Sequence, residues 1–67
     1  MQYFDYQKAA RDAHIPADKL AEICRLMRRE FPTDDMMYEL HVLRACAAVR
    51  DGFVRLEDVL AAEPAAR

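Results

Sequence analysis

The chain consists of amphipathic segments separated by short breaks at its three prolines and its single glycine. Ile15 precedes Pro16, and a residue before proline is disfavoured in the helical conformation, so a first helix should end there. Pro16 suits the first turn of the next helix, and Gly52 suits the position that follows a helix. No segment combines apolar–polar alternation with a β-branched cluster and turn signals. We therefore predict an all-α fold, a small bundle of three main helices plus a short C-terminal helix, near residues 5–14, 17–31, 34–51 and 56–62.

Two polar residues and the glycine are expected to mark helix ends. Asp5 is a favourable N-cap for the first helix, with Tyr3 and Phe4 packing at its entry. Thr33 is expected to cap the third helix, and Gly52 to follow its last turn. These signals support the boundaries given above.

The second predicted helix is amphipathic. Its apolar residues recur every three or four positions and form one stripe: Leu20, Ile23, Cys24, Met27 and Phe31. Acids stand near its start, and Arg25 and Arg29 stand in its second half, an order that suits the helix dipole. A helix of this kind packs one face against the rest of the protein.

The third predicted helix differs, because it carries two apolar faces. At about 100° per residue, four apolar residues gather on one side: Met36, Leu40, Leu43 and Ala47. Four more gather roughly 120° away by the same arithmetic: Tyr38, Val42, Cys46 and Val49. Two interpretations stay open. In one, this helix is central, with the first two helices on one side and the fourth on the other. In the second, one face packs inside the monomer and the other packs on a second chain.

The size of the chain favours association. In a domain of 67 residues, the free energy gained by burying apolar surface nearly balances the conformational entropy lost on folding. Small domains usually add disulfides, a metal or a partner chain. We therefore predict a homo-oligomer, with a dimer favoured and another protein as the other possible partner, and place the self-association face on one set of residues: Tyr38, Val42, Cys46 and Val49.

The composition argues against an enzyme. The chain contains no Ser and a single Thr, so serine-type nucleophilic catalysis is excluded. Adjacent Asp34 and Asp35 point about 100° apart on a helix and do not converge as an acid–base pair. Cys24 and Cys46 lie on apolar stripes, where thiols usually serve as small buried apolar groups. One glycine is too few for a phosphate-binding loop, and we expect no catalytic residue and no cofactor.

Metal binding and a membrane span are not expected either. His14, Cys24, His41 and Cys46 are ten, seventeen and five positions apart, whereas zinc ligands usually come in close pairs. A Cys24–Cys46 disulfide is geometrically possible, but free thiols are expected in the cytosol. Hydrophobic residues make up 54% of the chain and the net charge is −2, which excludes a disordered polar tail and a membrane span. No signal peptide is visible, so we expect a cytoplasmic protein.

Residues 9–23 form a pattern of their own. Ala10 stands where a first helix packs closely, and His14 stands where a turn glycine is common, followed by apolar Ile15. Leu20 and Ile23 take the buried positions of a second helix. This stretch resembles a helix-turn-helix unit. The resemblance implies a DNA-binding transcriptional regulator as an alternative function.

Charge limits that alternative. The DNA contacts it requires are Arg25, Arg28 and Arg29, while Asp18 and Glu22 would face phosphates. The same charged residues form a mixed surface that suits a partner protein. We predict one domain over residues 1–67 that acts without catalysis, through self-association or protein–protein interaction, with nucleic acid as a partner only in the alternative interpretation.

Overall fold

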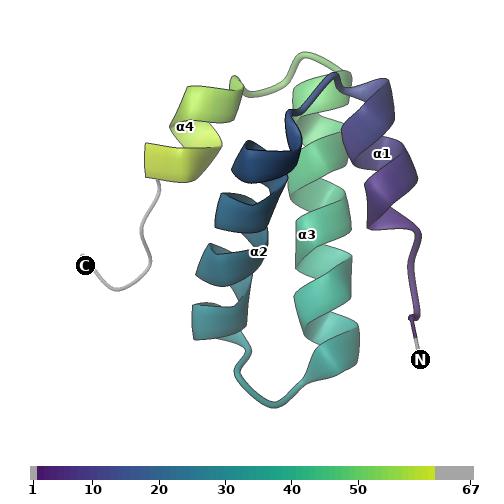
Figure 1. The fold of residues 1–67 in the computed structure, drawn as a ribbon, viewed down its shortest axis with the longest axis vertical. Coiled ribbons are helices and arrows are strands. Elements are labelled where there is room, and N and C mark those ends of the chain that lie inside the picture. The colour runs from purple at the N-terminus through teal and green to yellow at the C-terminus, as the bar shows by residue number, and fades with distance from the viewer. Residues whose placement is uncertain (1, 62–67) are drawn as a thin grey trace.

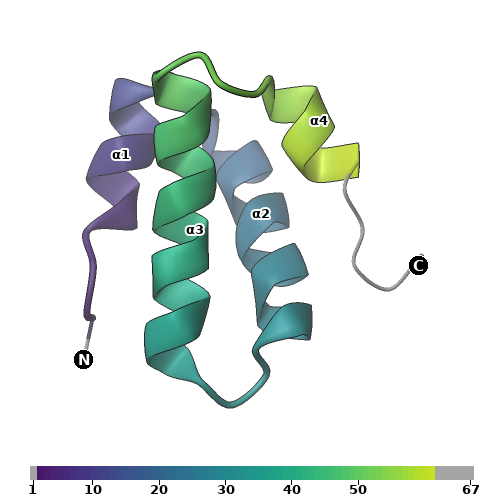
Figure 2. The ribbon, with the colours of Figure 1, turned by 180° about the vertical axis from the view of Figure 1, so that it is seen from behind.

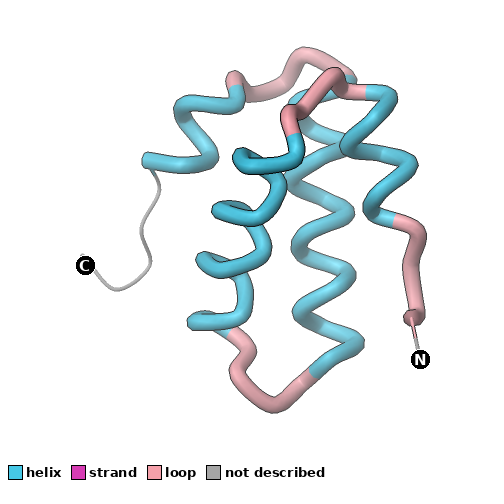
Figure 3. Tube along the Cα trace, viewed as in Figure 1, coloured by secondary structure: helices cyan, strands magenta, loops and turns pink. Residues whose placement is uncertain are grey.

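The computed structural model of the protein describes residues 2–61. It contains four helices, and Figures 1 and 3 show their arrangement: α1 (Tyr6–Asp12), α2 (Ala17–Glu30), α3 (Asp35–Arg50) and α4 (Leu56–Ala61). No strand occurs within this described range. The predicted all-α class, with three main helices and a short fourth, is confirmed. The end predicted for the last helix, Ala62, lies outside the described residues.

Aspartate side chains cap the first and third helices. The Asp5 carboxylate accepts a hydrogen bond from the Lys8 amide at 3.1 Å, as predicted. The Asp34 carboxylate accepts from the Met37 amide at 3.1 Å, so the cap predicted at Thr33 is wrong by one residue. A charged carboxylate at the positive end of a helix dipole is a stronger acceptor than a hydroxyl, which favours Asp34 over Thr33.

α1 and α3 end in the same way, with one residue in the left-handed conformation. His14 has φ +59° after α1, and Gly52 has φ +81° after α3. In each case the next amide reaches back to the last turn: Ile15 donates to the Ala10 carbonyl and Phe53 to the Ala48 carbonyl, both at 2.9 Å. This is the Schellman motif, which satisfies carbonyls at a helix end. The predicted role of Gly52 is confirmed.

α3 is the centre of the bundle, and α1 and α2 both pack along it (Figure 1). The shared core is formed by small and branched side chains: Ala9, Ala10, Ile15, Ile23, Val42 and Cys46. α4 packs on α2, and not on the far side of α3 as one interpretation required. The apolar edge of α4 packs against the same core through Leu56, Val59 and Leu60.

The structure corrects the expected self-association face on α3. Val42 and Cys46 are fully buried, and Tyr38 and Val49 pack against the same core. Val42 and Cys46 have no exposed surface with which to contact a second chain, while Tyr38 and Val49 are half-buried. The other face is the more open one, since Met36 is 48% exposed and no described helix lies in front of α3 in Figure 2.

A buried carboxylate ties the N-terminal segment to α3. Glu39 is 8% exposed and accepts hydrogen bonds from the amides of Tyr3, at 2.6 Å, and Phe4, at 3.0 Å. Two amide donors satisfy a charge that burial would otherwise penalise. The segment before α1 is therefore held against the middle helix, thirty-six positions away along the chain at Tyr3.

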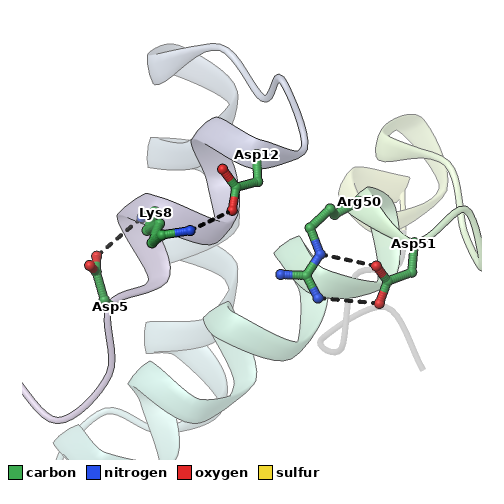
Figure 4. A network of polar contacts seen from close by, with 5 residues as sticks. All are labelled: Asp5, Lys8, Asp12, Arg50 and Asp51. Carbon is green, nitrogen blue, oxygen red and sulfur yellow. Dashed lines mark hydrogen bonds and ion pairs between the residues drawn. The ribbon is translucent and has the colours of Figure 1, made fainter.

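The ion pairs near the C-terminal ends of α1 and α3 are exposed (Figure 4). Lys8 donates to Asp12 at 3.0 Å, and this hydrogen bond holds the pKa of Asp12 below its ordinary value. Arg50 contacts both carboxylate oxygens of Asp51, at 3.0 and 3.3 Å, which lowers the pKa of Asp51. Exposed pairs of this kind add little to stability, so they are ordinary surface contacts.

Candidate binding groove

An open groove lies where α2, α3 and α4 meet. Its volume is about 390 Å³. Eight residues line it: Met27, His41, Arg44, Ala45, Ala48, Val54, Asp58 and Val59. The apolar members come from three separated parts of the chain, so the groove is a product of the tertiary fold and not of one amphipathic segment.

The residues of the groove explain why it is hollow. α3 contributes Ala45 and Ala48, whose side chains fill little of the space beside the helix. Met27 of α2 and Val59 of α4 supply larger apolar surfaces, and Val54 comes from the connection between α3 and α4. Since α4 packs on α2, the small alanine side chains of α3 remain half-buried at the floor of the groove beside it. A groove of this composition accepts apolar groups.

Polar groups stand among the lining residues. Arg44 and Asp58 are exposed and carry opposite charges. His41 is held in place, because its ring lies 4.5 Å from the Phe31 ring and its Nδ1 lies 2.9 Å from the Met37 carbonyl oxygen. The lining residues include no hydroxyl or thiol. The groove therefore offers apolar contact and charge pairing.

Phe53 stands at the edge of this groove and is 81% exposed. Its amide is bonded to the carbonyl of Ala48, a lining residue, and the next residue, Val54, also lines the groove. Two hydrogen bonds of the Schellman motif hold the backbone here: Gly52 to the Val49 carbonyl at 3.2 Å, and Phe53 to Ala48. The backbone of Phe53 is thus held beside the apolar groove, while its aromatic side chain lies in solvent. Sequence reasoning missed both Phe53 and the groove.

The three arginines expected to contact DNA do not form one exposed patch. Arg28 lies with its guanidinium carbon 3.8 Å from the centre of the Tyr38 ring. It also donates to the Phe31 carbonyl at 3.2 Å and to the Asp35 carboxylate at 2.9 Å. Arg28 therefore stabilises the contact between α2 and α3. Arg25 and Arg29 are exposed on α2.

The corner between α1 and α2 is a tight turn with one left-handed residue. His14 adopts the left-handed conformation that a glycine commonly supplies at this position, and Ile15 is buried behind it. The side chains fit DNA less well, because the exposed start of α2 presents Ala17 and Asp18. An acid at this place repels phosphates.

Both thiols are free, and they lie beside two tyrosines. Cys46 is buried, and burial raises the pKa of its thiol to about 11, with the charge of Cys24 adding to the effect. Tyr6 and Tyr38 meet edge to face with ring centres 6.5 Å apart, and burial raises the pKa of both. A raised thiol pKa means little thiolate at neutral pH, which is the opposite of what a nucleophilic cysteine needs. Within residues 2–61, no group of three or more His, Cys, Asp or Glu side chains is placed to hold a metal ion.

The chain matches no protein-family model, no curated protein and no solved structure. Between residues 2 and 61, no helix has the length and apolar character needed to cross a bilayer. The described residues present an apolar groove, charged residues of both signs in its lining and an exposed aromatic residue beside it.

Proposed function

We propose that this protein acts without catalysis, as a small helical binding module that holds an apolar side chain of another protein chain in the groove between α2, α3 and α4. The observation that carries the proposal is the groove itself, an open hollow of about 390 Å³ whose apolar lining is contributed by α2, α3, α4 and the α3–α4 connection. Pockets of about 300–1,000 Å³ with apolar linings and a few polar groups are the usual form of binding sites.

Two further features support association over chemistry. The lining residues carry no hydroxyl or thiol. Phe53 and Val54 extend the apolar surface from the groove onto the connection between α3 and α4. Aromatic residues are enriched where one protein contacts another, and an exposed apolar patch next to a groove is typical of such sites.

Selection of helical peptides from a random library against the immobilised protein tests the proposal. Selected peptides should carry an aromatic or large aliphatic anchor and should bind the protein in fluorescence anisotropy. Ala48→Glu places a charge on the groove wall, so it should weaken binding by at least about tenfold. Ala21→Glu makes the same change on the exposed face of α2 and should leave binding unchanged.

Two outcomes would remove the proposed function. One is a library that yields no binder to the wild-type protein. The other is a set of peptides that bind the Ala48→Glu variant as tightly as wild type, since they would then sit elsewhere. Circular dichroism of both variants confirms that each remains folded before binding is compared.

We propose DNA binding as a second candidate, favoured by one observation, the left-handed His14 in the turn between α1 and α2. The exposed Arg25 and Arg29 would contact phosphates. Fluorescence anisotropy with a random DNA duplex at low salt tests this candidate. Binding that weakens as salt rises, and that Arg25→Ala reduces, would support it. No salt-sensitive binding at tens of micromolar protein would end it.

A further inference from the structure

We infer that the chain held in the groove is a second copy of this protein, and that each copy inserts Phe53 into the groove of the other about a twofold axis. This inference rests on the binding role proposed for the groove and names its occupant. It also moves the self-association surface from the buried face of α3 to the junction of α2, α3 and α4.

Phe53, the residue that inserts, lies beside the groove of its own chain. The Phe53 amide is bonded to the Ala48 carbonyl at 2.9 Å, and Ala48 and Val54 both line the groove. The backbone conformation fixed by Gly52 leaves Phe53 81% exposed and outside its own groove. A twofold dimer uses the same patch on both copies, so that patch must complement itself. A projecting aromatic group beside a hollow meets this condition.

The charges of the groove also complement a second copy. Arg44 and Asp58 both line the groove and are exposed, so its charged groups are of both signs. About a twofold axis, Arg44 of one copy can face Asp58 of the other, and the reciprocal pair forms at the same time. Within one chain Asp58 pairs with exposed Arg55 at 3.6 Å, a contact weak enough to be exchanged. A partner whose surface carries charges of one sign would be attracted to Arg44 or Asp58 and repelled by the other. A second copy carries both signs and avoids this repulsion.

The area that such an interface can bury sets the expected affinity. Each buried aromatic side chain accounts for about 150–250 Å² of interface, so two Phe53 side chains supply about 300–500 Å². Stable dimers bury about 1,200–2,000 Å² in total. Phe53 therefore supplies the centre of an interface whose remaining area comes from the lining residues. We expect a small interface, and accordingly dissociation in the micromolar range.

α3 offers one competing surface. No described helix lies in front of α3 in Figure 2, and Met36, the first of the four residues of its other apolar face, is 48% exposed. The groove is favoured because it combines a hollow, charges of both signs and an exposed aromatic residue whose backbone is held beside it. Met36→Lys provides a variant that separates the two surfaces.

Sedimentation velocity over a range from low to hundreds of micromolar tests the dimer. Wild type should pass from monomer to dimer within this range. Phe53→Ala and Ala48→Glu should each raise the dissociation constant by at least about tenfold, since one removes the inserted group and the other charges the groove. Tyr3→Ala removes another exposed aromatic side chain, away from the groove, and should leave the dissociation constant within about twofold.

Mixing the two defective variants gives a sharper test. The Phe53→Ala copy keeps an open groove, and the Ala48→Glu copy keeps Phe53. A mixed dimer therefore retains one of the two contacts, while each variant alone retains none. The equimolar mixture should contain more dimer than either variant alone at the same total concentration.

The outcomes separate this inference from the proposed function. A wild-type monomer at hundreds of micromolar that still binds peptides in a way sensitive to Ala48→Glu overturns the second-copy inference alone. A monomer that binds no peptide removes both. A dimer that Phe53→Ala leaves intact but Met36→Lys dissociates overturns the inference and places the interface on the other apolar face of α3.

Discussion

Ile15 and Phe53 occupy the same position after two helix ends of the same geometry, yet Ile15 is 8% exposed and Phe53 is 81% exposed. Each is the residue after a left-handed one, and each amide bonds a carbonyl in the last turn at 2.9 Å. In this motif the apolar residue usually packs back on its helix, as Ile15 does on Ala10. Phe53 makes the backbone bond without the packing, so its side chain adds nothing evident to the fold of one chain.

The first prediction compares how much Ile15 and Phe53 each contribute to the free energy of unfolding. Ile15→Ala should lower the free energy of unfolding by about 2–4 kcal/mol, because it leaves a cavity in the core. Phe53→Ala should change it by less than about 0.5 kcal/mol, because the side chain is surrounded by solvent. Urea denaturation at a concentration where the protein is monomeric measures both values. Comparable losses for the two variants would contradict the role assigned to Phe53.

The second prediction concerns the two left-handed residues. Gly52→Ala should lower the free energy of unfolding by about 1–2 kcal/mol, because a side chain at φ +81° is strained. No atom lies within 4 Å of the added methyl group, so a clash adds nothing. His14→Gly should raise the free energy of unfolding by up to about 1 kcal/mol, since it removes the same strain after α1. Thermal melts of both variants should shift in opposite directions, and a shared direction would contradict this account.

The third prediction concerns the N-terminal segment. Glu39→Ala removes the acceptor for the amides of Tyr3 and Phe4, which it now binds at 2.6 and 3.0 Å. We expect a loss of about 1.5–3 kcal/mol, the usual contribution of hydrogen bonds to a charged group. Amide hydrogen exchange at Tyr3 and Phe4 should become faster, while exchange at Ile23 in α2 should follow the global change alone. Unchanged protection at the two amides would show that the contact does not hold the segment.

The fourth prediction is an alkaline loss of stability. Burial raises the pKa of Cys46 from an ordinary value of 9.0 to about 11. Between these values the folded thiol stays protonated while the unfolded thiol ionises, so the folded state binds more protons. The stabilising contribution is fully present below pH 9 and is lost as pH rises to about 11. Urea titrations across this range should show it, and Cys46→Ala should flatten the slope. An equal slope in the variant would assign the effect to Tyr6 and Tyr38, whose pKa values are also raised.

Much of the fold was predictable because its signals are local. Asp5 caps α1 and Gly52 ends α3 as predicted, since a cap depends on the few residues around it. Thr33 and Asp34 were both acceptable caps, and the choice between them depends on which side chain reaches the Met37 amide. Local patterns of this kind place helix ends to within a residue or two.

The candidate site was not predictable, because no local pattern encodes it. The two apolar faces of α3 follow from periodicity, but which face becomes the core depends on where α1 and α2 close on it. The groove exists because α4 packs on α2 and leaves Ala45 and Ala48 only half-buried. An apolar residue after a helix-ending glycine, such as Phe53, is expected to pack inward, so its exposure is a property of the tertiary structure alone.

The last prediction tests which face of α3 is the core. Val42→Glu puts an unpaired charge at a fully buried position. The cost is several kcal/mol, which is comparable to the whole free energy of unfolding of a small domain. Ala48→Glu makes a comparable change six residues along the same helix, at a position that lines the open groove, and its carboxylate can reach solvent. We expect far-UV circular dichroism to show loss of helicity for Val42→Glu and a cooperative melt for Ala48→Glu. If Val42→Glu instead remained folded and became monomeric, Val42 would be an interface residue, and the assignment of the two faces would have to be reversed.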